Sequence, residues 1–429
     1  MTLSTWKQPL RAAAFVPALV WSLAAASLPT AQPEDVGLSS ERLQRIHEMV
    51  MRRVNAGDLS GAVTIVARRG KLVHFEAHGV MDLDSKKPMA KDALFRLASS
   101  SKPVTAAAVL ILLDEGKLKL TDPVSKFIPE FKNPKVAMTT VESEVPMADR
   151  PPVTEPQLYT VPAHREITII DLLTHTSGLG SGGVAGPEFQ KVQQTLKAPD
   201  TLADFIPRLG ALPLDFQPGT QWRYSGLAAF DTLGRIVEIA SGMSFDQFLR
   251  TRLFGPLGME NTWFHVPDSE AARVVTTYYR RPKGLEKPEK PLIVFPPGYF
   301  SGAGGLTSTA EDYLRFAQML CNGGQFNGHR ILSPWTVNTM LSNNVGDLFN
   351  GQIGRPPKGM GFGLGGEVVM SAVDARMRKP DGSYGWDGAF GTYWWVNRKE
   401  QMVALIFVQT PGRSLQYDFD NAVAQAVIE

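Results

Sequence analysis

The stretch Phe95-Arg96-Leu97-Ala98-Ser99-Ser100-Ser101-Lys102-Pro103-Val104-Thr105-Ala106 places three serines ahead of a lysine and an apolar, helix-like segment. Serine oxygens at such a point usually satisfy the unpaired N–H groups of a first helical turn. A serine hydroxyl becomes a nucleophile only when a base lies within hydrogen-bond reach. Residues three apart share one helix face, so Lys102 reaches Ser99 if the helix begins at Ser99. Of the three serines, only Ser99 therefore has a candidate base, and Ser100 and Ser101 are expected to be structural. The same spacing occurs at Ser4 and Lys7, so it does not by itself identify a nucleophile.

The bulk composition is that of a globular protein with a sizeable core. The chain has 429 residues, 43% of them apolar and 20% charged, a length that suggests about two or three domains. Its 44 Lys plus Arg against 42 Asp plus Glu leave a formal charge of +2, without the basic runs that nucleic acid requires. A single cysteine, Cys321, excludes an intramolecular disulfide. We therefore expect no nucleic-acid partner and no cofactor.

The N-terminus has the pattern of a secretory signal peptide over residues 1–31. Lys7 and Arg11 precede an apolar run over residues 12–26, and small residues follow, with cleavage expected after that run or after Ala31. The run is too short for a permanent membrane span. We expect a secreted or periplasmic mature protein without a stable membrane span. The alternative is an uncleaved apolar extension on a cytoplasmic protein.

Strand patterns lie near both ends of the chain, and helical patterns lie between them. Apolar residues spaced three or four apart after Ser39 predict a capped helix, and β-rich runs follow at residues 62–67 and 72–77. Two further β-rich runs lie at residues 391–396 and 402–408. We predict an α+β fold, in which both ends join one antiparallel sheet flanked by helices and an inserted lobe is mostly helical.

The lobe boundaries follow from this pattern. Residues 32–95 and 300–429 form the predicted sheet lobe, and residues 96–299 form the helical lobe. Residues 133–164 are rich in Pro, Thr and Glu and lack sustained periodicity. They predict a long surface loop within the helical lobe.

The seven histidines of the chain show no metal-binding motif. His74 and His78 lie in an alternating segment in which residues 74, 76 and 78 share one strand face. An exposed polar strand face explains this pattern, so we predict no metal site there.

Around Ser99 the sequence resembles the serine β-lactamase and penicillin-binding-protein-like superfamily, particularly its class C-like branch and the related family VIII carboxylesterases. Further landmarks follow in order, and the resemblance covers residues 61–408. They are Asp171-Leu172-Leu173-Thr174-His175-Thr176-Ser177-Gly178-Leu179, Pro218-Gly219-Thr220-Gln221-Trp222-Arg223-Tyr224-Ser225, Pro256-Leu257-Gly258-Met259, Gly304-Gly305-Leu306-Thr307-Ser308-Thr309 and Gly385-Trp386-Asp387-Gly388-Ala389. This ordered set is far more specific than any single motif.

The resemblance implies a mechanism and a role for each residue. Ser99 attacks an acyl carbonyl, Lys102 holds and helps to deprotonate Ser99, and Tyr224 serves as general base beside the positive charge of Lys102. Water then cleaves the acyl-enzyme. The backbone N–H groups of Ser99 and Ala389 are the implied oxyanion donors. The alternative for Tyr224 is an aromatic anchor beside Trp222; the proline-glycine turn before it and the helix after it favour the catalytic role.

Two departures from the family pattern bear on the substrate. Trp386-Asp387-Gly388 stands where lactamases and peptidases carry Lys-Thr-Gly, so a cation suited to a substrate carboxylate is missing. Trp386 is instead expected to wall an apolar pocket, with Asp387 and Gly388 beside it. Gly226 stands where many relatives place an asparagine that holds an acyl-amide group. Both departures favour neutral esters.

We therefore predict a serine carboxylesterase that acts on small, short-acyl esters; the sequence leaves its oligomeric state open. A β-lactamase, a D-amino-acid peptidase or an amide hydrolase on the same site is the first alternative. A non-catalytic binding or sensor module built on this fold is the second.

Overall fold

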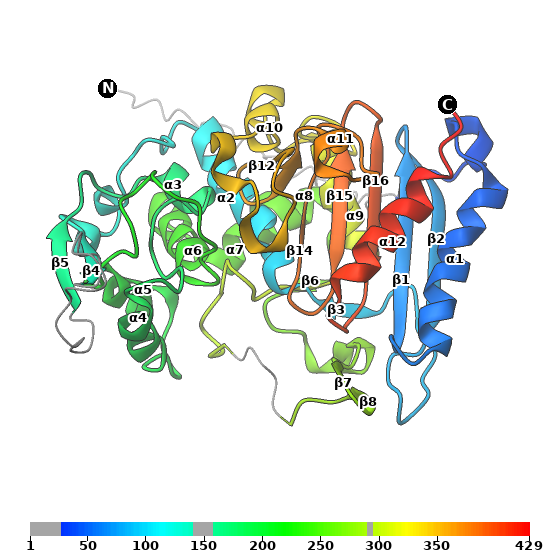
Figure 1. Cartoon of the computed structure of the whole chain (residues 1–429), viewed down its shortest axis with the longest axis horizontal. Coiled ribbons are helices and arrows are strands. Elements are labelled where there is room, and N and C mark those ends of the chain that lie inside the picture. The colour runs from blue at the N-terminus through cyan, green and yellow to red at the C-terminus, as the bar shows by residue number, and fades with distance from the viewer. Residues whose placement is uncertain (1–26, 140–157, 290–294) are drawn as a thin grey trace, which may run out of the picture.

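A seven-stranded antiparallel sheet organises one half of the molecule (Figure 1). The computed structural model describes residues 27–139, 158–289 and 295–429, so residues 1–26 of the expected signal peptide lie outside the described residues. In spatial order the strands are β12 (Met360–Phe362), β13 (Glu367–Val369), β14 (Tyr384–Asp387), β15 (Tyr393–Asn397), β16 (Met402–Phe407), β1 (Gly61–Arg68) and β2 (Lys71–Gly79). Val63 of β1 pairs with Phe407 of β16, so the two ends of the chain meet in one sheet as predicted.

Helices cover both faces of this sheet because its central strands are apolar on both sides. Alternate residues of β1 and β16, such as Ala62 and Ile406, pack with α1 (Ser40–Asn55) and α12 (Arg413–Ala424). The intervening residues, such as Ile65, pack with α9 (Ala310–Cys321) on the other face. A strand buried on both faces reads as a continuous apolar run rather than an alternating one.

The second half of the molecule is mostly helical and surrounds α2 (Ser101–Asp114). Residues 101–112 of α2 are all buried, as expected of a helix that is apolar on every side. The other helices are α3 (Ile169–Leu173), α4 (Gly186–Gln193), α5 (Leu202–Gly210), α6 (Ala228–Ser241), α7 (Phe245–Leu249), α8 (Gly255–Leu257), α10 (Pro334–Met340) and α11 (Ala372–Ala375). Among the described residues, no helix is both long and apolar enough to cross a membrane.

Short strands complete the fold. They are β3 (Leu94–Arg96), β9 (Thr307–Thr309) and β6 (Thr262–Trp263) in one small sheet, and the pairs β4 (Lys135–Thr139) with β5 (Leu158–Pro162), β7 (Tyr279–Arg281) with β8 (Gly284–Glu286), and β10 (Gln325–Phe326) with β11 (His329–Arg330). The β4–β5 pair lies within the expected surface loop 133–164, which is therefore not irregular throughout. β5 is largely exposed, so its sequence has no alternation of buried apolar and exposed polar residues. The buried Ala137 fixes β4 by donating its N–H to the Leu214 carbonyl at 2.8 Å.

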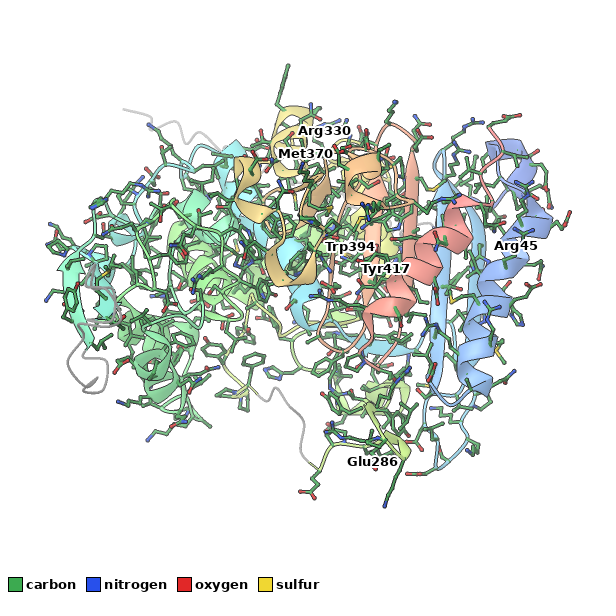
Figure 2. The ribbon with its side chains drawn as sticks, in the orientation of Figure 1. Arg45, Glu286, Arg330, Met370, Trp394 and Tyr417 are labelled. Atoms are coloured by element: carbon green, nitrogen blue, oxygen red, sulfur yellow. The ribbon has the colours of Figure 1, made fainter. Side chains whose placement is uncertain are left out.

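Side chains fill the interface between the sheet and its covering helices (Figure 2). Trp394 of β15 is completely buried, and its ring contacts Tyr313 of α9 at a centroid distance of 5.1 Å. Arg45 of α1 points away from the sheet. Aromatic contacts of this kind hold the sheet and its covering helices together.

The expectation of an exposed histidine face on β2 is wrong. His74 and His78 are buried, because α1 packs over β2 and covers this part of its surface. Their Nε2 atoms lie 2.7 and 2.9 Å from the hydroxyl of Thr64 on β1. Burial lowers the pKa of each imidazole to about 4, so both rings are neutral at pH 7.

Candidate active site

The serine run forms a tight turn rather than the first turn of the α-helix. Residues 98–100 adopt a 3₁₀ turn that leads directly into α2 at Ser101, so the helix begins at the serine run, but its first turn is 3₁₀ rather than α-helical. Ala98 has a φ of 45°, which lies outside the right-handed helical region and is costly for a residue with a side chain. Because this strained residue directly precedes Ser99, the chain enters the turn at Ser99 in a direction that a regular α-helix does not allow.

Ser100 and Ser101 fix the turn to neighbouring segments, as their predicted structural roles require. The Ser100 hydroxyl lies 3.0 Å from the Thr392 hydroxyl, which donates to the Leu97 carbonyl at 3.0 Å. Ser101 Oγ accepts the N–H of Leu306 at 3.2 Å. Neither side chain caps α2, so these hydroxyls connect segments instead of finishing the helix.

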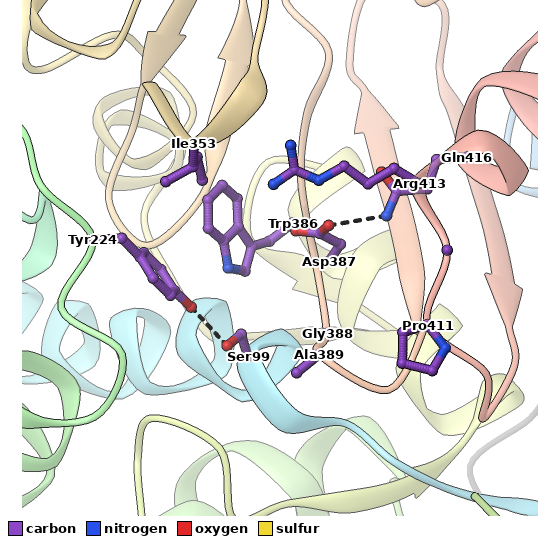
Figure 3. Close-up of a pocket in the computed structure, with 12 residues that line it drawn as sticks. Ser99, Tyr224, Ile353, Trp386, Asp387, Gly388, Ala389, Pro411, Arg413 and Gln416 are labelled. Atoms are coloured by element: carbon purple, nitrogen blue, oxygen red, sulfur yellow. Dashed lines mark hydrogen bonds between the residues drawn. The ribbon is translucent and has the colours of Figure 1, made fainter. Parts of the chain in front are cut away.

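The three side chains predicted to be catalytic meet at the Ser99 hydroxyl. Tyr224 Oη donates to Ser99 Oγ at 2.6 Å (Figure 3). Lys102 Nζ donates to the same oxygen at 3.2 Å. Ser99 is partly exposed and lines a cavity, whereas Lys102 is completely buried. Tyr224 and Lys102 thus contact one oxygen that a substrate can reach, an arrangement that suits nucleophilic catalysis.

Lys102 is held by backbone carbonyls as well as by Ser99. Its Nζ donates to the carbonyls of Gly226 at 2.7 Å and Ala303 at 2.8 Å. An ammonium group has three N–H donors, so the two carbonyls and Ser99 use all of them. A charged Lys102 cannot accept the Ser99 proton, and Tyr224 is the other side chain in contact with the Ser99 hydroxyl.

Asp231 of α6 supports the segment that holds Lys102. Its carboxylate accepts hydrogen bonds from the Tyr299 and Ser301 hydroxyls at 2.8 and 2.7 Å and from the Ala303 N–H at 2.9 Å. Burial raises the pKa of Asp231, although these hydrogen bonds oppose the increase. The sequence analysis did not identify this residue; the signal available was an aspartate directly after the apolar run Ala228-Ala229-Phe230.

His175 lies behind Tyr224 rather than beside Ser99. Its Nδ1 accepts the N–H of Ser225 at 3.2 Å, and its ring centroid lies 4.7 Å from that of Tyr224. Complete burial, with a further contribution from the charge of Lys102, holds its pKa well below the usual range. A neutral, buried ring in this place positions Tyr224.

The opposite wall of the cavity comes from the end of β14. A Cβ atom on Gly388 would lie 2.2 Å from the Leu97 carbonyl oxygen, so only glycine allows β14 to approach the serine turn this closely. Gly388 thereby brings Ala389 to the cavity that Ser99 lines. Within the described residues, the N–H groups of Ser99 and Ala389 donate to no other group, which leaves both for an oxyanion.

The cavity has a volume of about 300 Å³ and is lined by aromatic, glycine and polar residues (Figure 3). Trp386 lines the cavity, with its ring centroid 5.7 Å from that of Tyr224. Arg413, from the start of α12, reaches across Trp386. The lysine missing from β14 therefore does not leave the cavity without a positive group, because α12 supplies Arg413.

Asp387 lies in the cavity wall but is occupied by protein partners. Its carboxylate accepts from Gln416 Nε2 at 2.9 Å and from Arg355 Nη2 at 3.3 Å. Arg355 also donates to the buried Glu367 at 2.5 Å. These contacts give Asp387 the role of holding α12 against β14. The lining residues that the sequence analysis did not identify are Ile353, Gly391, Pro411, Gly412, Arg413 and Gln416.

Comparison with known proteins agrees with this architecture. The sequence model of the Beta-lactamase family matches residues 46–427. Protein Rv1367c of Mycobacterium tuberculosis is 38% identical over 371 residues, which cover 83% of this chain and 87% of that protein. Esterase EstB of Burkholderia gladioli is 30% identical over 431 residues, 94% of this chain and 99% of EstB. The solved structure of EstCE1, a hydrolase with promiscuous acyltransferase activity, superposes with a TM-score of 0.74 at 25% identity over 90% of this chain and 99% of EstCE1.

The chain belongs to the Beta-lactamase family. Its fold is the predicted α+β arrangement of an antiparallel sheet with flanking helices, and the resemblance drawn from the Ser99 stretch is confirmed. The protein is an enzyme of the serine hydrolase class. The roles of individual residues in the cavity stay predictions.

Proposed function

We propose that the protein is a carboxylesterase that hydrolyses small, short-acyl esters through an acyl-enzyme on Ser99. The observation that carries the proposal is the position of Ser99 Oγ, 2.6 Å from Tyr224 Oη and 3.2 Å from Lys102 Nζ, at the edge of an open cavity. The esterase activity named for EstB and the hydrolase activity named for EstCE1 support the same reaction class.

The proposed reaction has two steps. In the first, the Tyr224 phenolate takes the Ser99 proton, Ser99 Oγ bonds to the ester carbonyl carbon, and the N–H groups of Ser99 and Ala389 hold the oxyanion. The C–O bond to the alcohol then breaks, and the alcohol leaves with the proton from Tyr224. In the second step, Tyr224 takes a proton from water, the resulting hydroxide attacks the acyl carbon, and Ser99 leaves with that proton.

The cavity supports a small substrate. A volume of about 300 Å³ is at the lower end of typical ligand sites. Gly226 supplies no amide for an acyl-amide group, and the space beside its Cα is open within 4 Å. Trp386 gives the cavity an apolar floor, which suits an uncharged acyl or alcohol group.

A comparison of ester and lactam turnover tests the proposal. Wild-type protein and Ser99→Ala are assayed on p-nitrophenyl acetate and butyrate and on a chromogenic cephalosporin. We expect ester hydrolysis to exceed lactam hydrolysis in the wild type, and kcat/KM for esters to fall about 10⁴-fold or more in Ser99→Ala. Ser342→Ala, which removes an exposed serine hydroxyl from a helix end, is the matched control and keeps wild-type activity. Full ester activity in Ser99→Ala would refute the proposal.

The rival functions predict other results in the same experiment. Lactam turnover well above ester turnover would assign the site to a β-lactamase or amide hydrolase. Absence of turnover on every ester, lactam and D-alanyl peptide tested would assign the fold to a binding or sensor module.

We also propose that residues 1–31 direct export of the protein. The basic and then apolar pattern of this segment supports the proposal. Mass spectrometry of the protein from its native host is expected to find an N-terminus after Ala26 or Ala31. A mature protein that retains Met1 would exclude cleavage.

A further inference from the structure

A second cluster of chemically active side chains lies at the far edge of the sheet, between α1 and β2 (Figure 1). His47 projects from α1, and Glu76 and His78 project from β2. His47 Nδ1 lies 3.1 Å from Glu76 Oε2, and His78 Nε2 lies 3.9 Å from the same oxygen. One candidate ligand atom from each of the three residues lies within 4.8 Å of the other two.

We propose that His47, Glu76 and His78 bind a divalent metal ion of the zinc class and thereby fasten α1 to the edge strand β2. Two imidazoles and a carboxylate are a common protein ligand set for zinc, with a solvent molecule in the fourth position. Tetrahedral zinc with bonds of about 2.0–2.2 Å holds its ligand atoms about 3.3–3.6 Å apart. His47 Nδ1 and Glu76 Oε2 are 3.1 Å apart, close to that range, and one candidate ligand atom of each residue lies within 4.8 Å of the other two, so modest side-chain movements would bring all three into range.

The buried histidine of the cluster has an unused ring nitrogen. His78 has no exposed side-chain surface, and within the described residues its Nδ1 has no hydrogen-bond partner. Buried polar atoms without a partner are rare and costly, so this atom calls for a ligand. His47 and Glu76 have side chains that are 51% and 36% exposed, which leaves an entry path from solvent.

The surroundings of His78 match those of a metal-binding histidine. Such a ring commonly donates its second N–H to a neighbouring oxygen, which fixes its tautomer. His78 Nε2 lies 2.9 Å from the Thr64 hydroxyl, and that hydroxyl lies 2.7 Å from His74 Nε2. Because Thr64 has one proton, it accepts from one ring and donates to the other. When it accepts from His78 and donates to His74, the lone pair on His78 Nδ1 is free.

Zinc titration of the full chain, produced without a polyhistidine tag, tests the proposal. Isothermal titration calorimetry of chelator-treated protein with Zn²⁺ is expected to give one saturable site per chain, and added Zn²⁺ is expected to raise the thermal midpoint. His47→Ala and Glu76→Gln alter partly exposed side chains and should raise Kd at least about tenfold, as loss of even an outer-shell partner does. His329→Ala, which removes an exposed histidine elsewhere, should bind as the wild type does.

Each outcome decides the proposal. No saturable site, or equal affinity in wild type, His47→Ala and Glu76→Gln, would overturn it. Thr64→Val adds a second test, because a loss of about 10–100-fold in affinity is expected if Thr64 fixes the His78 tautomer. Binding is measured without a substrate, so its failure leaves the proposed esterase reaction untouched.

Discussion

The two walls of the cavity differ in how their polar groups are satisfied. On the helical wall, Ser99, Lys102 and Tyr224 bind one another, and Lys102 has a protein partner for each of its protons. On the sheet wall, the Ala389 N–H and the Arg413 guanidinium have no hydrogen-bond partner among the described residues. The polar side chains of the helical wall are already hydrogen-bonded to protein groups, whereas the sheet wall has hydrogen-bond donors that a substrate can use.

This difference separates chemistry from specificity. The helical wall holds a preorganised group of the kind that proton transfer requires, and its supporting residues are buried. The sheet wall contains Trp386, where this sequence departs from the lysine of lactamases and peptidases, and Arg413, which restores a positive charge from another element. Changes on the helical wall should therefore lower turnover of every ester, and changes on the sheet wall should alter the choice among esters.

The largest effect is expected from Tyr224→Phe, which keeps the ring and removes the oxygen that contacts Ser99 at 2.6 Å. Loss of a general base should lower kcat/KM about 10²–10⁴-fold for neutral and charged esters alike. Steady-state assays on several p-nitrophenyl esters measure this, and Tyr159→Phe on the exposed strand β5 is the matched control. A loss confined to one ester would place Tyr224 among the specificity residues and would contradict the assignment of chemistry to the helical wall.

The next effect concerns Asp420, which fixes α12 behind the sheet wall by accepting from the Tyr393 hydroxyl at 2.8 Å and Trp395 Nε1 at 2.9 Å. Burial raises its pKa from 3.8 to about 6. The folded protein therefore holds this proton more tightly than the unfolded chain, so the contribution to stability is complete below pH 3.8 and is lost as the pH rises through about 6.

The measurement is the free energy of unfolding in urea at pH 4 and pH 7 for wild type and Asp420→Asn. The stability of the wild type relative to Asp420→Asn should fall by up to about 3 kcal/mol between these pH values. The difference between the two proteins cancels the contributions of other titrating groups. Asp374→Asn, which changes an exposed carboxylate, should leave the difference from wild type constant. An unchanged difference for Asp420→Asn would show that this carboxyl titrates normally.

The Gly388→Ala substitution is expected to act on catalysis, with a slightly smaller effect when its fold-change in kcat is expressed as a free energy. The new methyl group would meet the Leu97 carbonyl oxygen and displace Ala389. A shift of about 1 Å in an oxyanion donor should lower kcat about 100-fold with little change in KM. Gly186→Ala, where nothing lies within 4 Å of the added atom, is the control. Wild-type kcat in a folded Gly388→Ala protein would exclude Ala389 as a donor.

The smallest effect is expected from Arg413→Gln and depends on the substrate. Turnover of p-nitrophenyl acetate should change less than about threefold, because no charge meets the guanidinium. An ester with a free carboxylate on its acyl chain should lose about tenfold in kcat/KM, the value of one exposed charge-assisted hydrogen bond. Equal changes for both esters would show that Arg413 does not select substrates.

Local spacing and ordered landmarks made part of the site predictable from the sequence. Ser99 and Lys102 are three residues apart, and Tyr224 follows a recognisable Pro-Gly turn, so their meeting could be predicted without coordinates. The β-rich runs at both ends of the chain likewise predicted the shared sheet. The tight turn at Ala98 could not be predicted, since its positive φ is imposed by packing rather than by local residue preference.

Other features depend on contacts between distant elements. Arg413 reaches the cavity only because α12 docks against β15 and β14, a contact without a local signal in the sequence. His74 and His78 are buried only because α1 covers their strand. Residues whose role depends on docking of this kind were the ones missed or misjudged.

The most direct test of the central claim, that Ser99 is the nucleophile, is reaction with a serine-directed fluorophosphonate followed by intact-mass and peptide mass spectrometry. Attack by Ser99 Oγ expels fluoride and leaves one phosphonyl group on the protein. We expect one such group per wild-type chain, located on the peptide that contains Ser99, and none on Ser99→Ala. Modification of a different residue, or an unmodified wild-type protein that still hydrolyses esters, would contradict the account.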